Sequence, residues 1–387
     1  MKKLYLDDPA IALLIEQEKS RQKKTLNLIA SENYAYPTVL RALGSELTDK
    51  YAEGTPGARF YAGCEVIDKI EQLAIERCTT LFGAEHANVQ PHSGSQANMA
   101  VYHALLQPGD TMLALDFSGG GHLSHGHPKN FSGKIYTIVT YGVDKQTHLI
   151  DYDDLERLAL LHKPRLIIAG GSSYSRIIDF ARISTIAHNI NAYCMADIAH
   201  TAGLISANLY PNPVPFFDVV TGTTHKTLRG PRGGFILCKK ELSAAIDRAV
   251  MPGIQGGPHM NTITAKAITF LLAAQPTFKQ YQKQVLTNAR SLAHALSQRG
   301  YKIVSAGTDT PLFVIDLTNK NLTGKQAEDK LSAAGITVSR SCIPFDTQKA
   351  SIGSGIRIGL SAATTRGYTE KDSATVADLI DAILADT

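Results

Sequence analysis

The sequence contains, at residues 219–227, the run Val219-Val220-Thr221-Gly222-Thr223-Thr224-His225-Lys226-Thr227. The first half of this run is typical of a buried strand, and the second half is a polar turn that carries Lys226. A lysine at the end of an apolar strand can be desolvated and lose its charge, as the amine of a Schiff base requires. The ordinary alternative is a solvated lysine at a strand end, so the interpretation depends on the surrounding sequence.

A second apolar run, residues 192–197, ends in Asp197, and His200 follows it. A carboxylate at this position can pair with the protonated nitrogen of a pyridine ring, although an aspartate after a strand can equally cap a helix. If the two strands are neighbours, Asp197 and Lys226 lie at one edge of the sheet, where open α/β folds bind their ligands.

Three further motifs would complete such a site. Ser93-Gly94-Ser95 lies between a short strand and a helix, where backbone amides can hold a phosphate, although Ser-Gly-Ser is also a common turn. The glycines of Gly119–Gly121 allow a close approach to a flat ligand on which His122 could stack. Arg357 lies in an apolar run, and its guanidinium suits either a substrate carboxylate or a structural ion pair between domains.

Short apolar runs alternate with helical stretches between residues 37 and 275. The candidate strands are Ala87–Val89, Met112–Leu115, Ile135–Thr140, Leu166–Ala169, Tyr193–Asp197, Val219–Thr223 and Gly234–Cys238. The candidate helices between them include Gln96–Leu106, Asp153–Leu161 and Ile183–Asn189. This alternation predicts an α/β fold with a mostly parallel sheet covered on both faces.

The patterns outside this region predict two further parts. We expect an N-terminal arm over residues 1–36 with a helix from Pro9 to Lys24, a large domain over 37–275, and a smaller α+β C-terminal domain over 276–387. The smaller domain is predicted from the β-like runs Lys302–Ser305, Leu312–Leu317 and Gly355–Ile358, and from the helical runs Gly324–Ala334 and Val376–Leu384.

Composition excludes several classes of protein. The 387 residues are 44% hydrophobic, and 39 basic against 35 acidic residues leave a charge of only +4, so no nucleic-acid partner is expected. The five cysteines are isolated, which indicates neither a disulfide framework nor a metal site. The first apolar run, Ile11–Ile15, is too short for a signal peptide, and no segment is long enough to span a bilayer, so we expect a cytoplasmic protein without a membrane partner.

The chain resembles the serine hydroxymethyltransferase family along nearly its whole length. The matching stretches are Leu28–Tyr34, Asp49–Gly54, Gly63–Glu65, Ser93–Ser95, Gly120–His122, Thr223–Leu228, Gly230–Gly234, Gln255–Pro258 and Ser354–Arg357. The resemblance implies a fold-type I architecture that binds pyridoxal phosphate, and a homodimer whose active sites are shared between subunits. It also implies a small amino acid as substrate, with reversible cleavage of serine to glycine and one-carbon transfer.

The resemblance assigns roles position by position. It implies that Lys226 forms the Schiff base, that Glu53 handles the proton of the β-hydroxyl group, and that Tyr61 and Thr223 assist catalysis. The residues expected to hold pyridoxal phosphate are Tyr51, Ser93, Gly94, Ser95, His122, Ser172, Asp197, His200, Lys226 and Gly257, of which Tyr51 and Gly257 would come from the other subunit. Ser31, Tyr61 and Arg357 would take the carboxylate of the amino acid.

The chain departs from the family pattern mainly where folate would bind. Phe345 replaces an asparagine that hydrogen-bonds the pterin, Phe60 replaces a tyrosine, and Gly119 replaces a histidine. A phenyl ring can only stack or block, so this comparison predicts weakened or absent use of tetrahydrofolate. Other departures are Thr55, Gly222 and Arg229, and Arg176 where a glycine is usual.

Three functions therefore remain open from the sequence. The first is reversible Cα–Cβ cleavage of serine or a related β-hydroxy amino acid to glycine, with one-carbon transfer. The second is the same cleavage without folate, as an aldolase, a transaldolase or an α-methylserine-type hydroxymethyltransferase. The third is a degenerate relative that binds pyridoxal phosphate without catalysis, and intact Lys226, Asp197, Glu53 and Arg357 argue against it.

Overall fold

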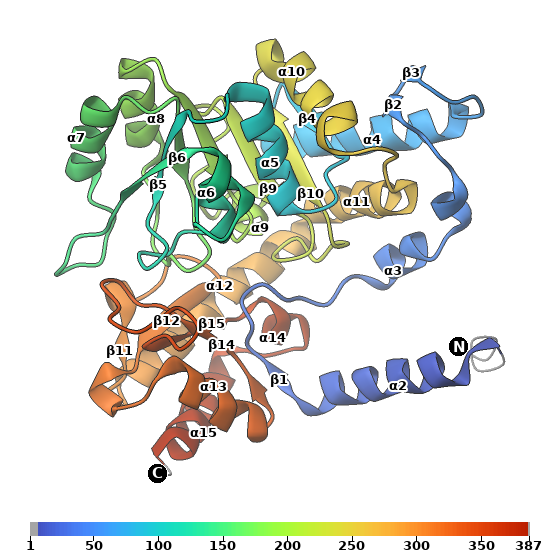
Figure 1. Ribbon diagram of the computed structural model, residues 1–387. Coiled ribbons are helices and arrows are strands. Elements are labelled where there is room, and N and C mark those ends of the chain that lie inside the picture. The colour runs from blue at the N-terminus through green and yellow to red at the C-terminus, as the bar shows by residue number, and fades with distance from the viewer. Residues whose placement is uncertain (1–6, 386–387) are drawn as a thin grey trace.

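The computed structural model describes residues 7–385, and its centre is a seven-stranded sheet (Figure 1). The strands follow the spatial order β4 (His86–Asn88), β10 (Gly234–Cys238), β9 (Val219–Thr223), β8 (Tyr193–Asp197), β7 (Leu166–Ala169), β5 (Thr111–Leu115) and β6 (Thr137–Tyr141). Only β10 is antiparallel to its neighbours. The prediction of an α/β fold with a mostly parallel sheet is confirmed.

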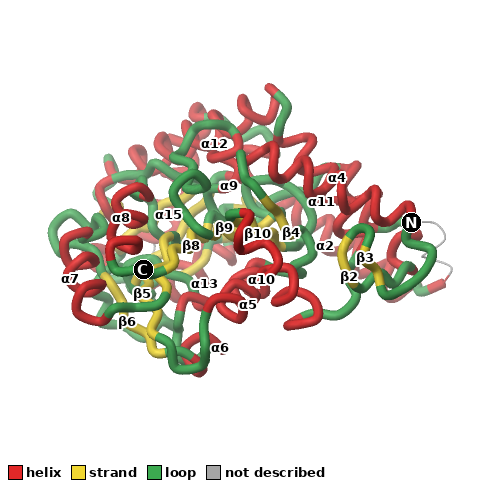
Figure 2. Tube along the Cα trace, turned by 90° about the horizontal axis from the view of Figure 1, so that it is seen from above, coloured by secondary structure: helices red, strands yellow, loops and turns green. Residues whose placement is uncertain are grey.

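Both faces of this sheet are covered, because successive side chains of a strand point to opposite faces. Ile167 of β7 joins a core with the helices of one face, and Ile168 joins a second core with those of the other. The first face carries α4 (Glu65–Phe82), α7 (Tyr152–His162), α8 (Phe180–Asn189), α9 (Ala202–Ser206) and α11 (Met260–Ala273). The second carries α5 (Gly94–Leu105), α6 (Phe131–Ile135) and α10 (Ser243–Arg248), so the strands lie between two helical layers (Figure 2).

One predicted strand begins too early. Ile135 belongs to α6 rather than to β6, which starts at Thr137. The helix forms because the Asn130 side chain accepts a hydrogen bond from the backbone of Ser132 and caps its first turn. An apolar residue at the end of so short a helix cannot be distinguished from a strand residue by hydrophobicity alone.

The C-terminal part builds a second sheet with its own core. Its strands, in spatial order, are β11 (Lys302–Ile303), β12 (Leu312–Asp316), β15 (Gly355–Gly359) and β14 (Ser339–Ser341), all antiparallel. They share a core with α12 (Pro276–Ser297), α13 (Gly324–Ala333) and α15 (Ser373–Ala385), while α14 (Ser361–Thr365) follows β15. The run Lys302–Ser305 is a strand only as far as Ile303, because Ser305 adopts a left-handed conformation with φ 58°.

The N-terminal segment reaches across the molecule. Helix α2 (Pro9–Lys24) projects away from the body in Figure 1 and exposes Leu13 and Leu14 by 53% and 58%. Strand β1 (Leu26–Asn27) then pairs with β13 (Ile336–Thr337) at the far end of the sequence. The chain returns to the large sheet through α3 (Pro37–Leu43) and the hairpin β2 (Gly54–Thr55) and β3 (Ala58–Arg59).

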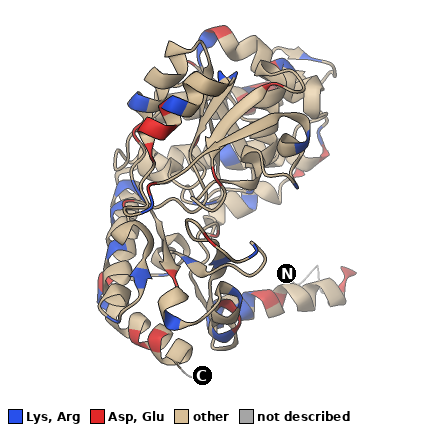
Figure 3. Ribbon diagram, turned by 60° about the vertical axis from the view of Figure 1, so that its left-hand side comes forward, with Lys and Arg blue, Asp and Glu red and all other residues tan. Residues whose placement is uncertain are grey.

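Charges of both signs are interspersed along α2 and over the helices of both parts in the view of Figure 3. Within residues 7–385, none of the helices combines the length and the apolar character needed to cross a membrane.

Candidate active site

A cavity of about 440 Å³ lies at the carboxyl ends of β8 and β9, between the large sheet and the C-terminal sheet. It brings together most of the residues that the sequence indicated. Those lining it are Ser31, Ser93, Gly94, Ser95, His122, Ser172, Asp197, His200, Thr223, Lys226 and Arg357. Strands β8 and β9 are parallel neighbours, so Asp197 and Lys226 lie at one edge of the sheet, as expected.

Lys226 lies on a fixed turn that follows β9. Its side chain is nearly buried, and its backbone carbonyl accepts a hydrogen bond of 2.8 Å from the Asn33 side chain. The Thr224 hydroxyl donates to the carbonyl of Pro231 at 2.7 Å and closes the turn. These contacts hold the lysine at the cavity wall rather than in solvent.

The electrostatic environment favours a neutral amine. Burial lowers the pKa of Lys226 to about 8; the charge of Asp197 acts in the opposite direction, and the cations Arg357 and Arg232 reinforce the decrease. An amine with this pKa is available as a nucleophile near neutral pH, which an unperturbed lysine is not.

Asp197 is held as a charged carboxylate. One oxygen accepts a hydrogen bond of 2.9 Å from Asn98 and lies 3.0 Å from His125 Nε2, while the other accepts from the backbone of Ala199 at 3.0 Å. Burial alone would raise the pKa of Asp197, but the hydrogen bond and charge of His125 and the charge of Lys226 hold this pKa well below its usual range. Such a carboxylate can stabilise a protonated ring nitrogen.

Two histidines in the cavity are neutral. Burial, followed by the charge of His125, lowers the pKa of His122 to about 4, and the Nδ1 atom of His122 accepts the backbone N–H of Ser124. Burial and then the charge of Lys226 lower the pKa of His200 well below its usual value. A neutral imidazole such as that of His122 offers a flat face to an aromatic ligand.

The N-terminus of α5 faces the same cavity. Ser93 caps the helix by accepting a hydrogen bond of 3.2 Å from the backbone of Gln96, and the first amides of a helix have no acceptor within it. A Cβ on Gly94 would lie only 2.6 Å from Thr223 Cγ2, so the close contact of this turn with β9 requires a glycine. The turn therefore presents backbone N–H groups and a helix dipole to an anion.

Arg357 is a partly buried cation. Its Nη1 donates to the carbonyl of Ser172 at 2.7 Å, while its buried Nε has no hydrogen-bond partner among residues 7–385. Burial lowers the pKa of Arg357 to about 10. Its register partner on β14, Ser339, also lines the cavity with an unpartnered buried hydroxyl. Buried polar groups are almost always hydrogen-bonded, so these two side chains fit a ligand that carries a carboxylate.

Four expected residues, Tyr51, Glu53, Tyr61 and Gly257, do not line this cavity. They form a surface group: the Tyr51 hydroxyl donates to Glu53 at 3.4 Å, and the Tyr51 and Tyr61 rings are 5.1 Å apart. The Glu53 carboxylate raises the pKa of Tyr61. Gly257 lies against the Tyr51 ring, where a Cβ would come within 3.0 Å. Tyr51 and Tyr61 are 54% and 46% exposed, so the group is assembled but uncovered.

The expected effect of Phe345 on folate binding stays a prediction. Phe345 does not line the cavity; its ring is 51% exposed, lies 6.4 Å from that of His148, and has the Lys145 ammonium over it. Its φ of 60° is a left-handed conformation, which asparagine adopts more readily than phenylalanine. An asparagine at this position therefore has a backbone reason that is independent of any ligand.

Sequence reasoning missed the wall of the cavity that the C-terminal domain supplies. This wall consists of Ser339, Arg340, Ser341, Cys342 and Ala350. The short polar strand β14 gives no hydrophobic signal, and only its pairing with β15, which carries Arg357, could have pointed to it.

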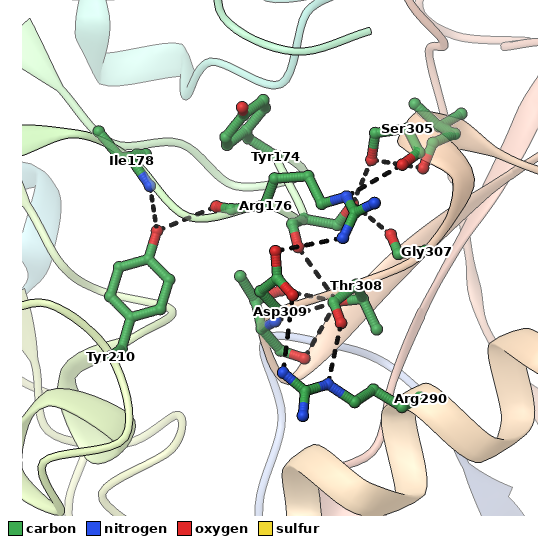
Figure 4. Close-up of polar contacts among 12 residues, drawn as sticks. Tyr174, Arg176, Ile178, Tyr210, Arg290, Ser305, Gly307, Thr308 and Asp309 are labelled. Atoms are coloured by element: carbon green, nitrogen blue, oxygen red, sulfur yellow. Dashed lines mark hydrogen bonds and ion pairs between the residues drawn. The ribbon is translucent and has the colours of Figure 1, made fainter. Parts of the chain in front are cut away.

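Arg176 joins the two parts of the molecule beside this site (Figure 4). Its Nε donates to the carbonyl of Ser305 at 2.9 Å, and its Nη1 lies 3.2 Å from the carboxylate of Asp309. The same backbone segment carries Ser172, whose carbonyl holds Arg357. This contact therefore fixes the C-terminal domain against the segment that anchors the carboxylate-binding arginine.

The buried amine, the charged carboxylate, the glycine-dependent helix N-terminus and the unpaired arginine fit pyridoxal phosphate and an amino acid. Fold and site together define the class of fold-type I pyridoxal-phosphate-dependent enzymes.

A sequence model described as serine hydroxymethyltransferase matches residues 4–380, so the chain belongs to the serine hydroxymethyltransferase family. Members of this family are pyridoxal-phosphate-dependent transferases that act on serine and glycine in one-carbon metabolism, and the chain is accordingly a pyridoxal-phosphate-dependent transferase.

Proposed function

We propose that this chain binds pyridoxal phosphate through Lys226 and interconverts serine, or a related β-hydroxy amino acid, with glycine. One observation carries the proposal: a single cavity contains a buried amine with a pKa near 8, a charged carboxylate and an arginine whose buried Nε has no partner among the described residues. Membership of the family supports the same reaction.

Each part of the cofactor has a matching group in the cavity. Asp197 would pair with the ring nitrogen, His122 would stack on the ring with Ser172 and His200 nearby, and Ser93–Ser95 would hold the phosphate. When bound, the cofactor supplies an electron sink for the pair of electrons left on Cα when a bond to it breaks.

The chain's own residues would position the substrate. Arg357 and Ser31 bind and orient the amino acid carboxylate, which sets the direction of the Cα–Cβ bond. Thr223 donates its hydroxyl proton to the carbonyl of Ala199 at 3.3 Å, which fixes its side chain beside Lys226. The β14 wall closes the cavity on the side of the C-terminal domain and limits access of water.

A homodimer with shared active sites would supply the remaining residues. Glu53 would take the proton of the β-hydroxyl group, and Tyr51, Tyr61 and Gly257 would complete the other subunit's cavity. Two observations support this arrangement: the surface group is preassembled outside the cavity of its own chain, and α2 projects with exposed leucines that a second subunit could cover (Figure 1).

The proposal has two alternatives, which differ in whether tetrahydrofolate accepts the one-carbon unit. We favour transfer to tetrahydrofolate, because membership of the family supports it and Phe345 does not line the cavity. The alternative is folate-independent cleavage of an aldolase or α-methylserine type. It draws on Phe60, which is 72% exposed next to Tyr61 and lacks the hydroxyl usual at this position.

Glycine formation from serine, measured with and without tetrahydrofolate, tests the proposal. We expect a faster reaction with tetrahydrofolate, and the same rates in a Phe345→Asn variant. Equal rates with and without folate would favour the aldolase. If no glycine forms in either assay although pyridoxal phosphate is bound, the chain is a degenerate relative and the proposal is wrong.

A further inference from the structure

Three potential metal ligands meet at the edge of the large sheet opposite the active site. His188 lies in the last turn of α8, Cys194 is the second residue of β8, and Asp218 immediately precedes β9. Cys194 and Asp197 are three residues apart on one strand, so the two sites are separated by about 10 Å. The site therefore shares a strand with the catalytic cavity but not a wall.

The distances among these atoms form a consistent triangle. Cys194 Sγ lies 3.6 Å from His188 Nε2 and 3.4 Å from Asp218 Oδ2, and the latter two atoms are 3.3 Å apart. The nitrogen–oxygen distance is longer than a good hydrogen bond, which has a length of about 2.7–3.2 Å. Tetrahedral zinc with ordinary bond lengths separates its ligands by about 3.5–3.6 Å from sulfur to nitrogen or oxygen, and by about 3.3–3.4 Å from nitrogen to oxygen. The three side chains thus match one face of a zinc tetrahedron.

Hydrogen bonds orient the His188 ring toward this triangle. The Ser184 hydroxyl donates its proton to the carbonyl of Phe216 at 2.7 Å, so it accepts from His188 Nδ1, which lies 3.3 Å away. In the tautomer whose proton is on Nδ1, Nε2 carries a lone pair that faces Oδ2 of Asp218 at 3.3 Å, as a metal ligand requires.

The carboxylate is oriented by groups outside the triangle. Lys239 Nζ binds the Oδ1 atom of Asp218 at 2.7 Å, and the backbone N–H of Cys194 donates to Oδ2 at 2.9 Å. Supporting contacts of this kind fix the ligands of protein metal sites before the ion binds. Cys194 is fully buried and Asp218 nearly so, while the His188 side chain is 44% exposed, so an ion can approach from the histidine side.

We propose that His188, Cys194 and Asp218 bind a zinc(II) ion. Among the described residues 7–385 the cluster has these three members, and water would complete a four-coordinate ion. Binding transfers the thiol proton of Cys194 to solvent, because the thiolate is the ligand. The ion would tie the end of α8 to the first residues of β8 and β9. The isolated cysteines gave no sign of this site in the sequence, because its ligands come from three separate elements.

Zinc titration of the cofactor-loaded enzyme tests this site. The protein is first dialysed against a chelator; zinc is then added in competition with a chromophoric chelator, and bound metal is counted per chain. Cobalt(II) serves as a second probe, because its visible bands report tetrahedral geometry. Loading the cofactor first keeps the His122, His125 and Asp197 cluster of the catalytic cavity from competing for the ion.

The variant His188→Asn removes one ligand from a half-exposed position, so the fold should survive. His162→Asn is the matched control, because His162 occupies the last turn of the neighbouring helix α7 outside the cluster. We expect one zinc per chain and a zinc-dependent rise in melting temperature in the wild type and in the control. In His188→Asn the affinity should fall by at least about a hundredfold, since loss of a supporting contact alone costs 10–100-fold.

Tetrahedral cobalt bands should disappear in His188→Asn and, in an independent variant, in Cys194→Ser. Absence of zinc from the wild type, or zinc bound equally tightly by the wild type and His188→Asn, would overturn the proposal. In the first case the three side chains are a hydrogen-bonded cluster only, in which the Cys194 thiol donates to Asp218.

Discussion

The cavity and the surface group are both clusters of polar residues, but they differ in how far they are buried. In the cavity, burial sets the protonation of Lys226 and Asp197 and leaves Arg357 in need of an anion. In the surface group, Tyr51 and Glu53 touch each other, with Tyr51 54% exposed and Glu53 partly buried. The first region is enclosed within the chain, whereas the second is not. A carboxylate becomes an effective acid or base near neutral pH only in such a desolvated setting.

Replacing Lys226 with alanine should have the largest effect. The variant should lose the visible absorbance of the bound cofactor, borohydride-trappable label and all turnover, because the lysine amine that lines the cavity has been removed. Peptide mapping of the labelled wild type provides an internal control. Lys266 is also buried, but its Nζ donates to the carbonyls of Val89, Pro91 and Gly234, so it should carry no label. Label on Lys266 and none on Lys226 would refute the assignment.

Mixing two inactive variants would show whether the surface group serves the other subunit. Lys226→Ala and Glu53→Gln homodimers, allowed to exchange subunits in equal amounts, should recover about a quarter of wild-type activity, because half of the dimers are mixed and each has one intact site. The measurement is glycine formation, with exchange verified by mass spectrometry of the native dimers. No recovery despite exchange would place Glu53 in the site of its own chain.

Arg357→Ala should weaken amino acid binding without releasing the cofactor. Loss of a charge-assisted pair in a dry site costs roughly 2–5 kcal/mol. The dissociation constant of glycine, obtained by spectral titration, checks this expectation. Arg340→Ala is a control on the same wall, because Arg340 already pairs with Glu328 at 2.9 Å. An unchanged glycine affinity in Arg357→Ala would remove its assigned role.

The pH dependence of cofactor capture should report the buried amine. Only a neutral amine attacks the aldehyde, so the rate should rise as pH passes upward through the pKa of Lys226, about 8, and then level off. Between pH 7 and pH 8 we expect an increase of about fivefold in the neutral fraction, and less than about twofold above that. Stopped-flow mixing of apoenzyme with pyridoxal phosphate checks this, with Nα-acetyl-lysine, whose side-chain amine is free, as the reference. A rate that keeps rising to pH 10, as for the reference, would contradict the lowered pKa.

The smallest effect is expected at the contact between the two domains. Arg176→Gly removes the donors to Ser305 and Asp309 but leaves Arg290 within 3.6 Å of Asp309. We expect stability to change by no more than about 1 kcal/mol, because the pair is partly exposed. Glycine affinity should fall a few-fold with kcat nearly unchanged, since Arg357 is displaced but not lost. The control Arg182→Ala breaks an ion pair within the large domain and should leave glycine affinity unaltered.

The large sheet was predictable from the sequence because its strands are buried on both faces and appear as apolar runs. The antiparallel direction of β10 could not be predicted from the sequence, because this strand is as apolar as its parallel neighbours. Short strands such as β1 and β14 carry no hydrophobic signal, and they form only because β13 and β15 offer them partners. Strand pairing, unlike burial, is a property of distant parts of the sequence.

The residues of the candidate site differ in the same way: some lie at the ends of apolar strands, and others lie on a strand that forms only through pairing. Asp197 sits at a strand end and Lys226 just beyond one, so the pattern of neighbouring strands located them. Ser339 contributes an unpaired hydroxyl from a polar strand that has no pattern of its own. Phe345 was chosen for its chemistry alone; it does not line the cavity, its backbone is left-handed, and its effect on folate stays a prediction.

The pairing of β1 with β13 has a consequence for how the protein is made. Leu26 can pair with Ile336 only after Ile336 has been synthesised, and synthesis of the intervening chain takes roughly 15–60 s at 5–20 residues per second. Throughout that time the N-terminal strand has no partner, and the exposed leucines of α2 precede it on the nascent chain. The ribosome therefore releases a protein whose first segment is among the last to fold, which makes this arm the natural point of contact for chaperones and for aggregation.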